Sequence, residues 1–530
     1  MGDSTEEYSK MVDNGKLYMG LSDPGRERVY MYLSQANRHG LIAGASGTGK
    51  TVTMKVMTES FSDAGVPVFL CDVKGDVSGL IEPGEDNAGM QKRIDKFGIR
   101  DTFQFKSYPV TFWDIYGKGG HPIRTTVSDM GPEILSRIMG LTEVQEGVLN
   151  IIFRIADEHG LEIIDLKDLR AVLQYIGENR AEYSMKYGNM AAQSISAITR
   201  ALIPLEDQGG NEFFGEPALD ITDWIRTDAS GHGMINLLHA VETIKYPKLY
   251  AAFLLWMMAE LFEVLPEVGD PEKPTIVFFF DEAHLLFNGA PRGLVQKIEQ
   301  TVKLIRSKGV GIYFVTQSPS DIPDSVLAQC SNRVQHALRA YTPAEQKAVR
   351  TAAQTFRANP AFKTEDVIMQ LGTGEALVSF LDEKGIPQIV EKTSILCPQS
   401  LMAPASEANK ARVIAQSPFA YKYNKAVDNE SAYEILEKKA VERAEQEELE
   451  RQRAEIEAER AKLEAEKEKA AKEAEKKAQK EAEKKAKEEE KAKAAAQKKK
   501  DRVKAKIETQ VVSTAGQLLR KGLFGILSRK

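Results

Sequence analysis

The stretch Gly44-Ala45-Ser46-Gly47-Thr48-Gly49-Lys50-Thr51 decides the fold class of this chain. It matches the pattern G-x-x-x-x-G-K-T, in which glycines let backbone N–H groups turn inward around the phosphates of a nucleotide. An apolar run at 40–43 precedes the loop as an expected strand, and a helical pattern at 51–57 follows it. This strand–loop–helix context predicts an α/β fold of the P-loop nucleotide-binding class.

The loop also contains the side chains that such a site needs. Lys50 places a positive charge at the β- and γ-phosphates, and the hydroxyl of Thr51 can hold Mg²⁺. Val52 lies in the first turn of the expected helix, whose N-terminus would face the phosphates. Residues 44–52 are therefore expected to bind ATP or GTP together with Mg²⁺.

A second motif, Thr275-Ile276-Val277-Phe278-Phe279-Phe280-Asp281-Glu282, is an apolar strand that ends in two carboxylates. In this Walker B pattern Asp281 binds Mg²⁺ through water, and Glu282 orients and deprotonates the attacking water. A buried strand that merely ends in an acidic turn is the alternative. The presence of a P-loop in the same α/β pattern favours the Walker B interpretation.

Gln317 follows the strand expected at 311–316. Ligands of α/β sheets bind at the carboxyl ends of strands, so this amide is expected to contact the attacking water or the γ-phosphate. The plainer alternative is a polar cap at the end of a strand.

Three arginines are candidates for a contact with the γ-phosphate of a neighbouring subunit, because hydrolysis develops negative charge there. Arg306 ends the helix after the Walker B motif, Arg333 begins the next strand, and Arg38 precedes the P-loop strand. Each can equally be an ordinary surface arginine, and the sequence does not choose among them.

Asp72-Val73-Lys74-Gly75 fits the D-x-x-G pattern of GTPases. The guanine-reading N-K-x-D is missing, since Asn424-Lys425-Ala426-Val427 lacks the aspartate. Asp72 and Lys74 are therefore expected to line the loop beside the nucleotide. His284 is either structural or couples the site to a partner.

Composition predicts a cytoplasmic protein without a transmembrane segment. The three cysteines, Cys71, Cys330 and Cys397, are scattered and lack metal-ligand spacing, which suits a reducing compartment. The N-terminus shows no apolar signal region, and the apolar run at 253–259 is too short to span a bilayer. The net charge is −6. Acidic residues dominate in 1–433 and basic residues dominate in the remainder, so the body shows no general affinity for nucleic acid.

The alternation of expected strands and helices divides the chain into parts. Strands are expected at 234–238, 275–280, 311–316 and 333–338, and a hairpin at 375–381 and 387–392. The expected parts are a lead-in at 1–36, an ATPase core with a parallel-rich sheet at 37–80 and 233–400, a mainly helical insertion at 81–232, a linker at 401–430, a charged tail at 431–508 and an amphipathic segment at 509–530.

The charged tail is rich in Glu, Lys, Arg and Ala and contains no Gly or Pro, a composition typical of a long helix. A single charged helix and a coiled coil both fit, and partial disorder is a further alternative. Apolar residues within 511–527 can form one helical stripe. That stripe would dock on the chain itself or on another copy, or bind a protein partner or a membrane surface.

These blocks together resemble the HerA–FtsK superfamily of ATPases. The resemblance rests on the P-loop, on Asp72-Val73-Lys74-Gly75-Asp76, on Asp281-Glu282-Ala283-His284, on Thr316-Gln317-Ser318-Pro319 and on Cys330-Ser331-Asn332-Arg333. Their spacing and the charged tail are most similar to the YjgR-like bacterial subgroup of HerA-helicase-like proteins.

The resemblance implies a RecA-like core, ATP rather than GTP, and a homohexameric ring with nucleotide at the subunit interfaces. It implies Gln317 as a sensor and Arg306 or Arg333 reaching across the interface. Relatives move double-stranded DNA through the ring. Two functions therefore stay open: a DNA translocase or helicase-like motor, and an ATP-driven switch or scaffold that acts on proteins through the tail.

Overall fold

One sheet organises the part of the chain that the computed structural model describes, residues 11–288 and 292–488, and it contains thirteen strands. Their spatial order is β1-β2-β13-β12-β11-β4-β10-β9-β5-β8-β6-β7, with β3 on the free side of β2. The strands are β1 (Val12–Asp13), β2 (Lys16–Ser22), β3 (Arg28–Tyr32), β4 (Gly40–Ala43), β5 (Val68–Asp72), β6 (Val110–Asp114), β7 (His121–Pro122), β8 (Ile235–His239), β9 (Ile276–Phe280), β10 (Val310–Thr316), β11 (Asn332–His336), β12 (Glu375–Ser379) and β13 (Glu391–Ile395).

The strands from β11 to β7 run parallel to their neighbours, and those from β12 to β1 pair antiparallel. Four of them, β4, β10, β9 and β5, are consecutive in the sheet. Because the carboxyl ends of parallel strands meet at one edge, the loops that follow these four strands are brought side by side.

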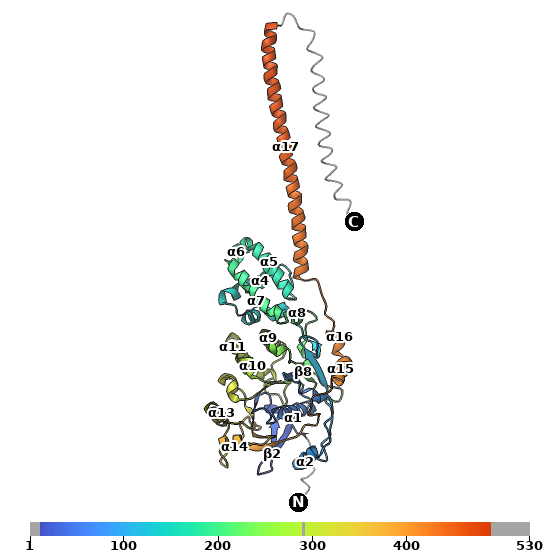
Figure 1. The fold of residues 1–530 in the computed structure, drawn as a ribbon, viewed down its shortest axis with the longest axis vertical. Helices are drawn as coiled ribbons and strands as arrows, with labels where there is room; N and C mark the ends of the chain where they lie inside the picture. The colour runs from blue at the N-terminus through green and yellow to red at the C-terminus, as the bar shows by residue number, and fades with distance from the viewer. Residues whose placement is uncertain (1–10, 289–291, 489–530) are drawn as a thin grey trace. The chain divides into compact units, whose positions relative to one another are not determined.

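Helices cover both faces of this sheet (Figure 1). The helices of the described residues are α1 (Lys50–Asp63), α2 (Ala88–Phe97), α3 (Val127–Met139), α4 (Glu143–Glu158), α5 (Leu166–Glu178), α6 (Arg180–Tyr187), α7 (Ala192–Asp207), α8 (Gly210–Phe213), α9 (Pro247–Val264), α10 (His284–Phe287), α11 (Arg292–Leu304), α12 (Asp324–Leu327), α13 (Pro343–Gln354), α14 (Thr364–Gln370), α15 (Glu407–Gln416), α16 (Phe419–Tyr423) and α17 (Ala432–Glu488).

The central strand β9 shows why its sequence is apolar throughout. Successive side chains of a strand point to opposite faces, so Phe278 and Phe280 face one side and Val277 and Phe279 the other. Phe278 and Phe280 belong to the core that includes α9 and the helical insertion, whereas Val277 and Phe279 belong to the core beneath α1 and α2. Both faces are buried, as parallel sheets require.

The helices α4 to α7 form a cluster beside the sheet (Figure 1), in which α4 and α7 pack on α3, and α3 packs on α9. The chain divides into two compact units with the boundary after Glu437, so the long helix α17 begins in the first unit and continues in the second. Among the described helices, none combines the length and the apolar composition that crossing a bilayer requires.

The predicted fold class is confirmed: a parallel-rich α/β sheet, helices inserted between its strands, and a long charged C-terminal helix. Of the hairpin expected at 375–381 and 387–392, β12 lies where its first strand was expected, and it pairs with β13 at 391–395 rather than with 387–392. The sequence did not indicate β2 or β6, which both join the sheet. Such short apolar runs are strands only because a partner strand pairs with them. The parts of the tail at 489–508 and 509–530 lie outside the described residues.

Candidate active site

The P-loop joins β4 to α1 at the carboxyl edge of the sheet, and its glycines are required by its shape. Gly44, Gly47 and Gly49 have φ values of 154°, 75° and 117°, a region that side chains disfavour. A Cβ atom at Gly44 would lie 2.5 Å from Cβ of His336. The loop therefore approaches β11 closely, and α1 begins directly after it with its N-terminal N–H groups facing the loop.

Lys50 is buried at the start of α1 and turns back onto the loop. Its Nζ donates to the carbonyl oxygens of Gly44 at 2.7 Å and Ala45 at 3.1 Å. Burial lowers the pKa of Lys50, and the nearby positive charge of Lys74 lowers it further. The loop thus contains a desolvated cation, which a phosphate group would stabilise.

His336, at the end of β11, packs against the P-loop and contacts α1. It was not identified from the sequence as part of the site. Its Nε2 lies 2.8 Å from Oγ1 of Thr53 in α1, and its Nδ1 lies 2.9 Å from the carbonyl oxygen of Glu375. Burial lowers the pKa of His336 to about 4, so the ring is neutral near pH 7. A lone histidine at a strand end offers no sequence signal for this role.

The Walker B carboxylates follow β9, two strands from β4. Asp281 is buried, and burial raises its pKa to about 6. Its Oδ2 has no hydrogen-bond partner within residues 11–288 and 292–488. Glu282 has a φ of 48°, a backbone conformation that is uncommon for a residue other than glycine. Such outliers cluster at functional sites.

Three polar side chains surround the carboxylate of Glu282. Nζ of Lys74 lies 2.5 Å from Oε1, Nδ1 of His284 lies 3.2 Å from Oε2, and Nε2 of Gln317 lies 3.5 Å from Oε2. Although burial opposes the effect, the hydrogen bond from Lys74 lowers the pKa of Glu282. Gln317 and Glu282 meet because β10 and β9 are parallel neighbours.

The residues of the D-x-x-G pattern form a turn after β5, and the side chain of Asp72 stabilises this turn. Its Oδ1 accepts a hydrogen bond from the N–H of Gly75 at 2.7 Å, and its Oδ2 accepts from the N–H of Val77 at 3.2 Å. Burial raises the pKa of Asp72 to about 6. The turn presents Lys74 to the Walker B carboxylates, and Nζ of Lys74 also lies 3.9 Å from Oδ2 of Asp281.

The donor set fits Mg²⁺. This ion prefers oxygen ligands and is usually held by one or two carboxylates together with substrate phosphates. Asp281 presents a buried carboxylate oxygen without a hydrogen-bond partner among the described residues, and Thr51 adds a hydroxyl in the first turn of α1. The residues named from the sequence for this ion are therefore chemically suited to it.

The structure does not bring the three candidate arginines to the P-loop of the same chain. Arg306 and Arg38 precede β10 and β4, so they lie at the opposite edge of the sheet, and both pair with Asp270, at 2.8 Å and 3.5 Å. Arg333 donates hydrogen bonds to the carbonyl oxygens of Cys330, Thr355 and Leu327. These contacts hold Arg333 in the fold of its own chain.

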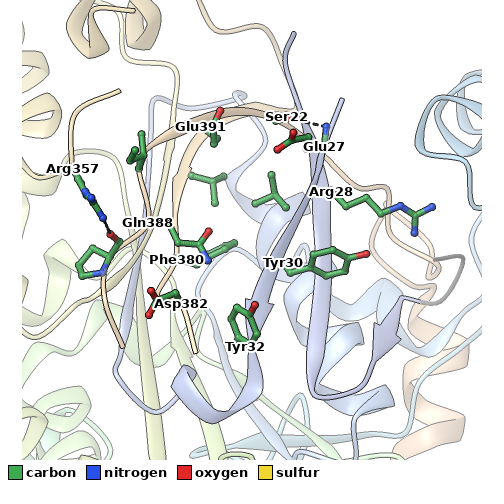
Figure 2. A pocket seen from close by; sticks show the side chains of 14 residues that line it. Ser22, Glu27, Arg28, Tyr30, Tyr32, Arg357, Phe380, Asp382, Gln388 and Glu391 are labelled. Atoms are coloured by element: carbon green, nitrogen blue, oxygen red, sulfur yellow. Dashed lines mark hydrogen bonds between the residues drawn. The ribbon is translucent and has the colours of Figure 1, made fainter. Parts of the chain in front are cut away.

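A separate cavity of about 460 Å³ lies among β3, β12 and the chain that leads into β13 (Figure 2). Tyr30, Tyr32 and Phe380 lie around it with the acidic Asp382 and Glu391, and Arg357 approaches from one side. None of its lining residues belongs to the motifs named above. The cavity is therefore distinct from the P-loop site.

Comparisons with known proteins agree with this geometry. A family model described as "Helicase HerA-like C-terminal" matches residues 19–530. The DNA double-strand break repair helicase HerA of Sulfolobus acidocaldarius is 21% identical over 395 residues, which span 71% of this chain and 69% of the relative.

A solved structure at low sequence identity has a similar fold. The plasmid coupling protein TrwB in complex with the ATP analogue ADPNP has a TM-score of 0.50 at 14% identity, covering 76% of this chain and 98% of that one. VirB4 of Thermoanaerobacter pseudethanolicus has a TM-score of 0.44 at 14% identity, covering 75% and 99%.

Proposed function

Because this chain belongs to the helicase HerA-like C-terminal family of P-loop ATPases, we propose that it hydrolyses ATP and moves double-stranded DNA as a homohexamer. The observation that supports the ATPase activity is the meeting of Lys50, Asp281, Glu282 and Gln317 at one edge of the sheet. The first belongs to the loop after β4, the next two follow β9, and the last follows β10.

In the proposed reaction each residue has a defined task. The N–H groups of residues 44–52 and the ammonium of Lys50 hold the phosphates. Thr51 and Asp281 would hold Mg²⁺, which when bound neutralises charge on the phosphates. Gln317 orients the attacking water, and Glu282 accepts its proton.

Arg306 is our candidate for the arginine that acts on the neighbouring subunit. Its side chain is 40% exposed, and its ion-pair partner Asp270 is 66% exposed, so water screens this pair and releases it at little cost. Arg38, at 26% exposure, is the second candidate, since it shares the same aspartate. Arg333 is the weakest of the three because its guanidinium already donates to three carbonyl oxygens.

The DNA part of the proposal rests on the family, because the surface charges give it limited support. Lys297 and Lys308 are candidates for facing a central pore, but each forms an ion pair with a glutamate. Nζ of Lys297 lies 3.5 Å from Oε1 of Glu133, and Nζ of Lys308 lies 3.3 Å from Oε1 of Glu267. Lys303 is exposed.

The test is steady-state ATP hydrolysis by the full chain, with and without double-stranded DNA, at two salt concentrations. We expect several-fold stimulation by DNA that weakens as salt rises, because phosphate contacts release counterions. The Glu282→Gln variant is the control for contaminating ATPases. ATP hydrolysis that DNA leaves unchanged would contradict the DNA motor.

That second outcome would favour an ATP-driven switch or scaffold that acts on proteins through the tail. One observation supports this alternative. The N-terminus of α17 is held by the insertion: Ser431 and the N–H of Tyr433 both donate to Oδ1 of Asp168, and the N–H of Ala432 donates to the carbonyl of Glu162. A movement of the insertion would therefore act directly on the first turn of α17.

A further inference from the structure

Lys74 makes the shortest ion pair at the active-site edge, and its partner is the residue that would act as the base. Its Nζ lies 2.5 Å from Oε1 of Glu282 and 3.9 Å from Oδ2 of Asp281. A carboxylate engaged by an ammonium at this distance is a poor proton acceptor, because the positive charge stabilises its ionised form. The ion pair with Lys74 therefore opposes the activation of water by Glu282.

The backbone that carries Lys74 is fixed while its side chain is accessible. Asp72 accepts hydrogen bonds from Gly75 and Val77, and Gly75 has a φ of 77°, so the turn has a defined shape. The side chain of Lys74 is 43% exposed, whereas that of Glu282 is 8% exposed. The ammonium can thus move at the end of its flexible stem while the carboxylate stays in place.

The charges at this edge decide where Lys74 would move. The positive charge of Lys74 lowers the pKa of the buried Lys50, and the carboxylates of Asp281 and Glu282 raise the pKa of both lysines. A terminal phosphate at the P-loop brings at least one further negative charge to this group. It would compete with Glu282 for Lys74 through a charge-assisted hydrogen bond of the same kind.

We propose that Lys74 senses the terminal phosphate of ATP and restrains Glu282 until that phosphate is bound. With ADP, Lys74 stays on Glu282. With ATP, Lys74 transfers to the γ-phosphate, and Glu282 is left to Gln317 and to the attacking water. This inference rests on the proposed function in that it takes the nucleotide to be ATP, but it concerns binding and is tested without turnover.

The experiment measures the affinities of the full chain for ADPNP and for ADP by equilibrium titration. Lys74→Met is expected to weaken ADPNP binding by roughly tenfold or more and to leave ADP binding almost unchanged, since one charge-assisted hydrogen bond is lost. Lys74→Arg keeps the charge and is expected to retain the preference for ADPNP. Lys186→Met is the matched control, because Lys186 pairs with Glu158 at the same 2.5 Å in the helical insertion.

A double-mutant cycle tests the restraint on Glu282. Glu282→Gln removes the competitor for Lys74 and is expected to bind ADPNP more tightly than the wild type. Adding Lys74→Met should then cost more affinity than it does alone, which gives a non-zero coupling. Lys74→Gln makes the same comparison where Lys74→Met does not fold.

Two results would overturn the inference: equal weakening of ADPNP and ADP by Lys74→Met, or no change in either. Failure of the proposed function looks different. If the wild type binds ADPNP but does not hydrolyse ATP, the proposed ATPase activity is contradicted. The double-mutant cycle at Lys74 can still be measured, because it uses binding alone. A wild type that hydrolyses ATP, with unchanged nucleotide preference in Lys74→Met, contradicts only the inference about Lys74.

Discussion

Gly44 shows how closely single residues constrain the nucleotide loop. It lies between the end of β4 and His336, and a Cβ atom there would meet the Cβ of His336 at 2.5 Å. Gly47 also has a positive φ, but a Cβ there would meet nothing within 4 Å. Both glycines have backbone conformations that a side chain would strain, and only Gly44 adds steric crowding.

We expect Gly44→Ala to lower the free energy of unfolding by about 1–3 kcal/mol through overpacking, and to weaken ADP binding as the loop shifts. Gly47→Ala should cost only about 1 kcal/mol, from its backbone conformation. Urea denaturation and ADP titration of both variants check this. Equal losses in the two would contradict the close approach to His336.

Lys50 and Glu282 are assigned to different steps, so their variants should differ. Lys50→Ala is expected to lose tight nucleotide binding, because the cation at the phosphates is removed. Glu282→Gln should bind ATP but hydrolyse it more slowly by about 10²–10⁴-fold, the usual contribution of a general base. Nucleotide titration and single-turnover hydrolysis test the pair, and normal turnover by Glu282→Gln would disprove the Walker B assignment.

His39 is a buried histidine with a structural task. Its Nε2 lies 2.7 Å from the carbonyl of Val302, and its Nδ1 accepts from the N–H of Ile312. Burial lowers the pKa of His39 to about 4, against about 6.5 in the unfolded chain. Between these two values the unfolded state binds a proton that the folded state excludes, so stability falls as pH falls from 6.5 to 4.

His39→Asn removes this term and suits the φ of 52°, which asparagine tolerates. The variant should be less stable than the wild type at pH 8, because it loses packing. The difference should shrink by up to about 3 kcal/mol as pH falls from 6.5 to 4. Urea denaturation across this pH range measures it, and a constant difference would mean that the pKa of His39 is the same in the folded and the unfolded chain.

At the scale of elements, Asp168 joins two helices. Its Oδ2 accepts from the N–H groups of Ile164 and Asp165 before α5, and its Oδ1 accepts from Ser431 and Tyr433 at the start of α17. The side chain is fully buried. One buried carboxylate thus supplies two of the hydrogen bonds that hold the start of the charged helix on the helical insertion.

Asp168→Ala should lower the free energy of unfolding by about 2–4 kcal/mol, because several buried donors lose their acceptor. It should also expose the chain before α17 to limited proteolysis. Lys167→Ala is the matched control: it breaks a half-exposed ion pair with Glu434 in the same junction and should cost less than about 1 kcal/mol. Equal proteolysis in both variants would show that Asp168 does not hold the helix.

At the scale of the whole molecule, the active site of one chain holds no arginine from the three candidates, so the proposal needs a second copy. If Arg306 acts on the neighbouring subunit, Arg306→Ala and Glu282→Gln proteins should each be inactive alone. Mixed together, they should recover part of the activity at interfaces that combine an intact Arg306 with an intact Glu282. Hydrolysis across a series of mixing ratios checks this, with Arg306→Lys as the charge-retaining comparison. No recovery, where subunits are shown to exchange, counts against Arg306.

Much of the fold and part of the site could be predicted because local rules encode them. The positive φ angles of the P-loop require its glycines. The apolar sequence before Asp281 is required because a parallel sheet buries both faces of that strand. Fold class, the predicted strands of the core and the long helix that begins at 432 follow from such patterns. The sequence resemblance already indicated the family, and the family model agrees.

The tertiary structure alone decided which distant residues meet. Lys74 and Glu282 are separated by more than two hundred positions, and they touch because β5 and β9 are neighbours in the sheet. The same holds for His336 beneath the P-loop and for Asp168 at the start of α17. Strand order is a property of the whole packed sheet, and no local pattern in the chain determines it.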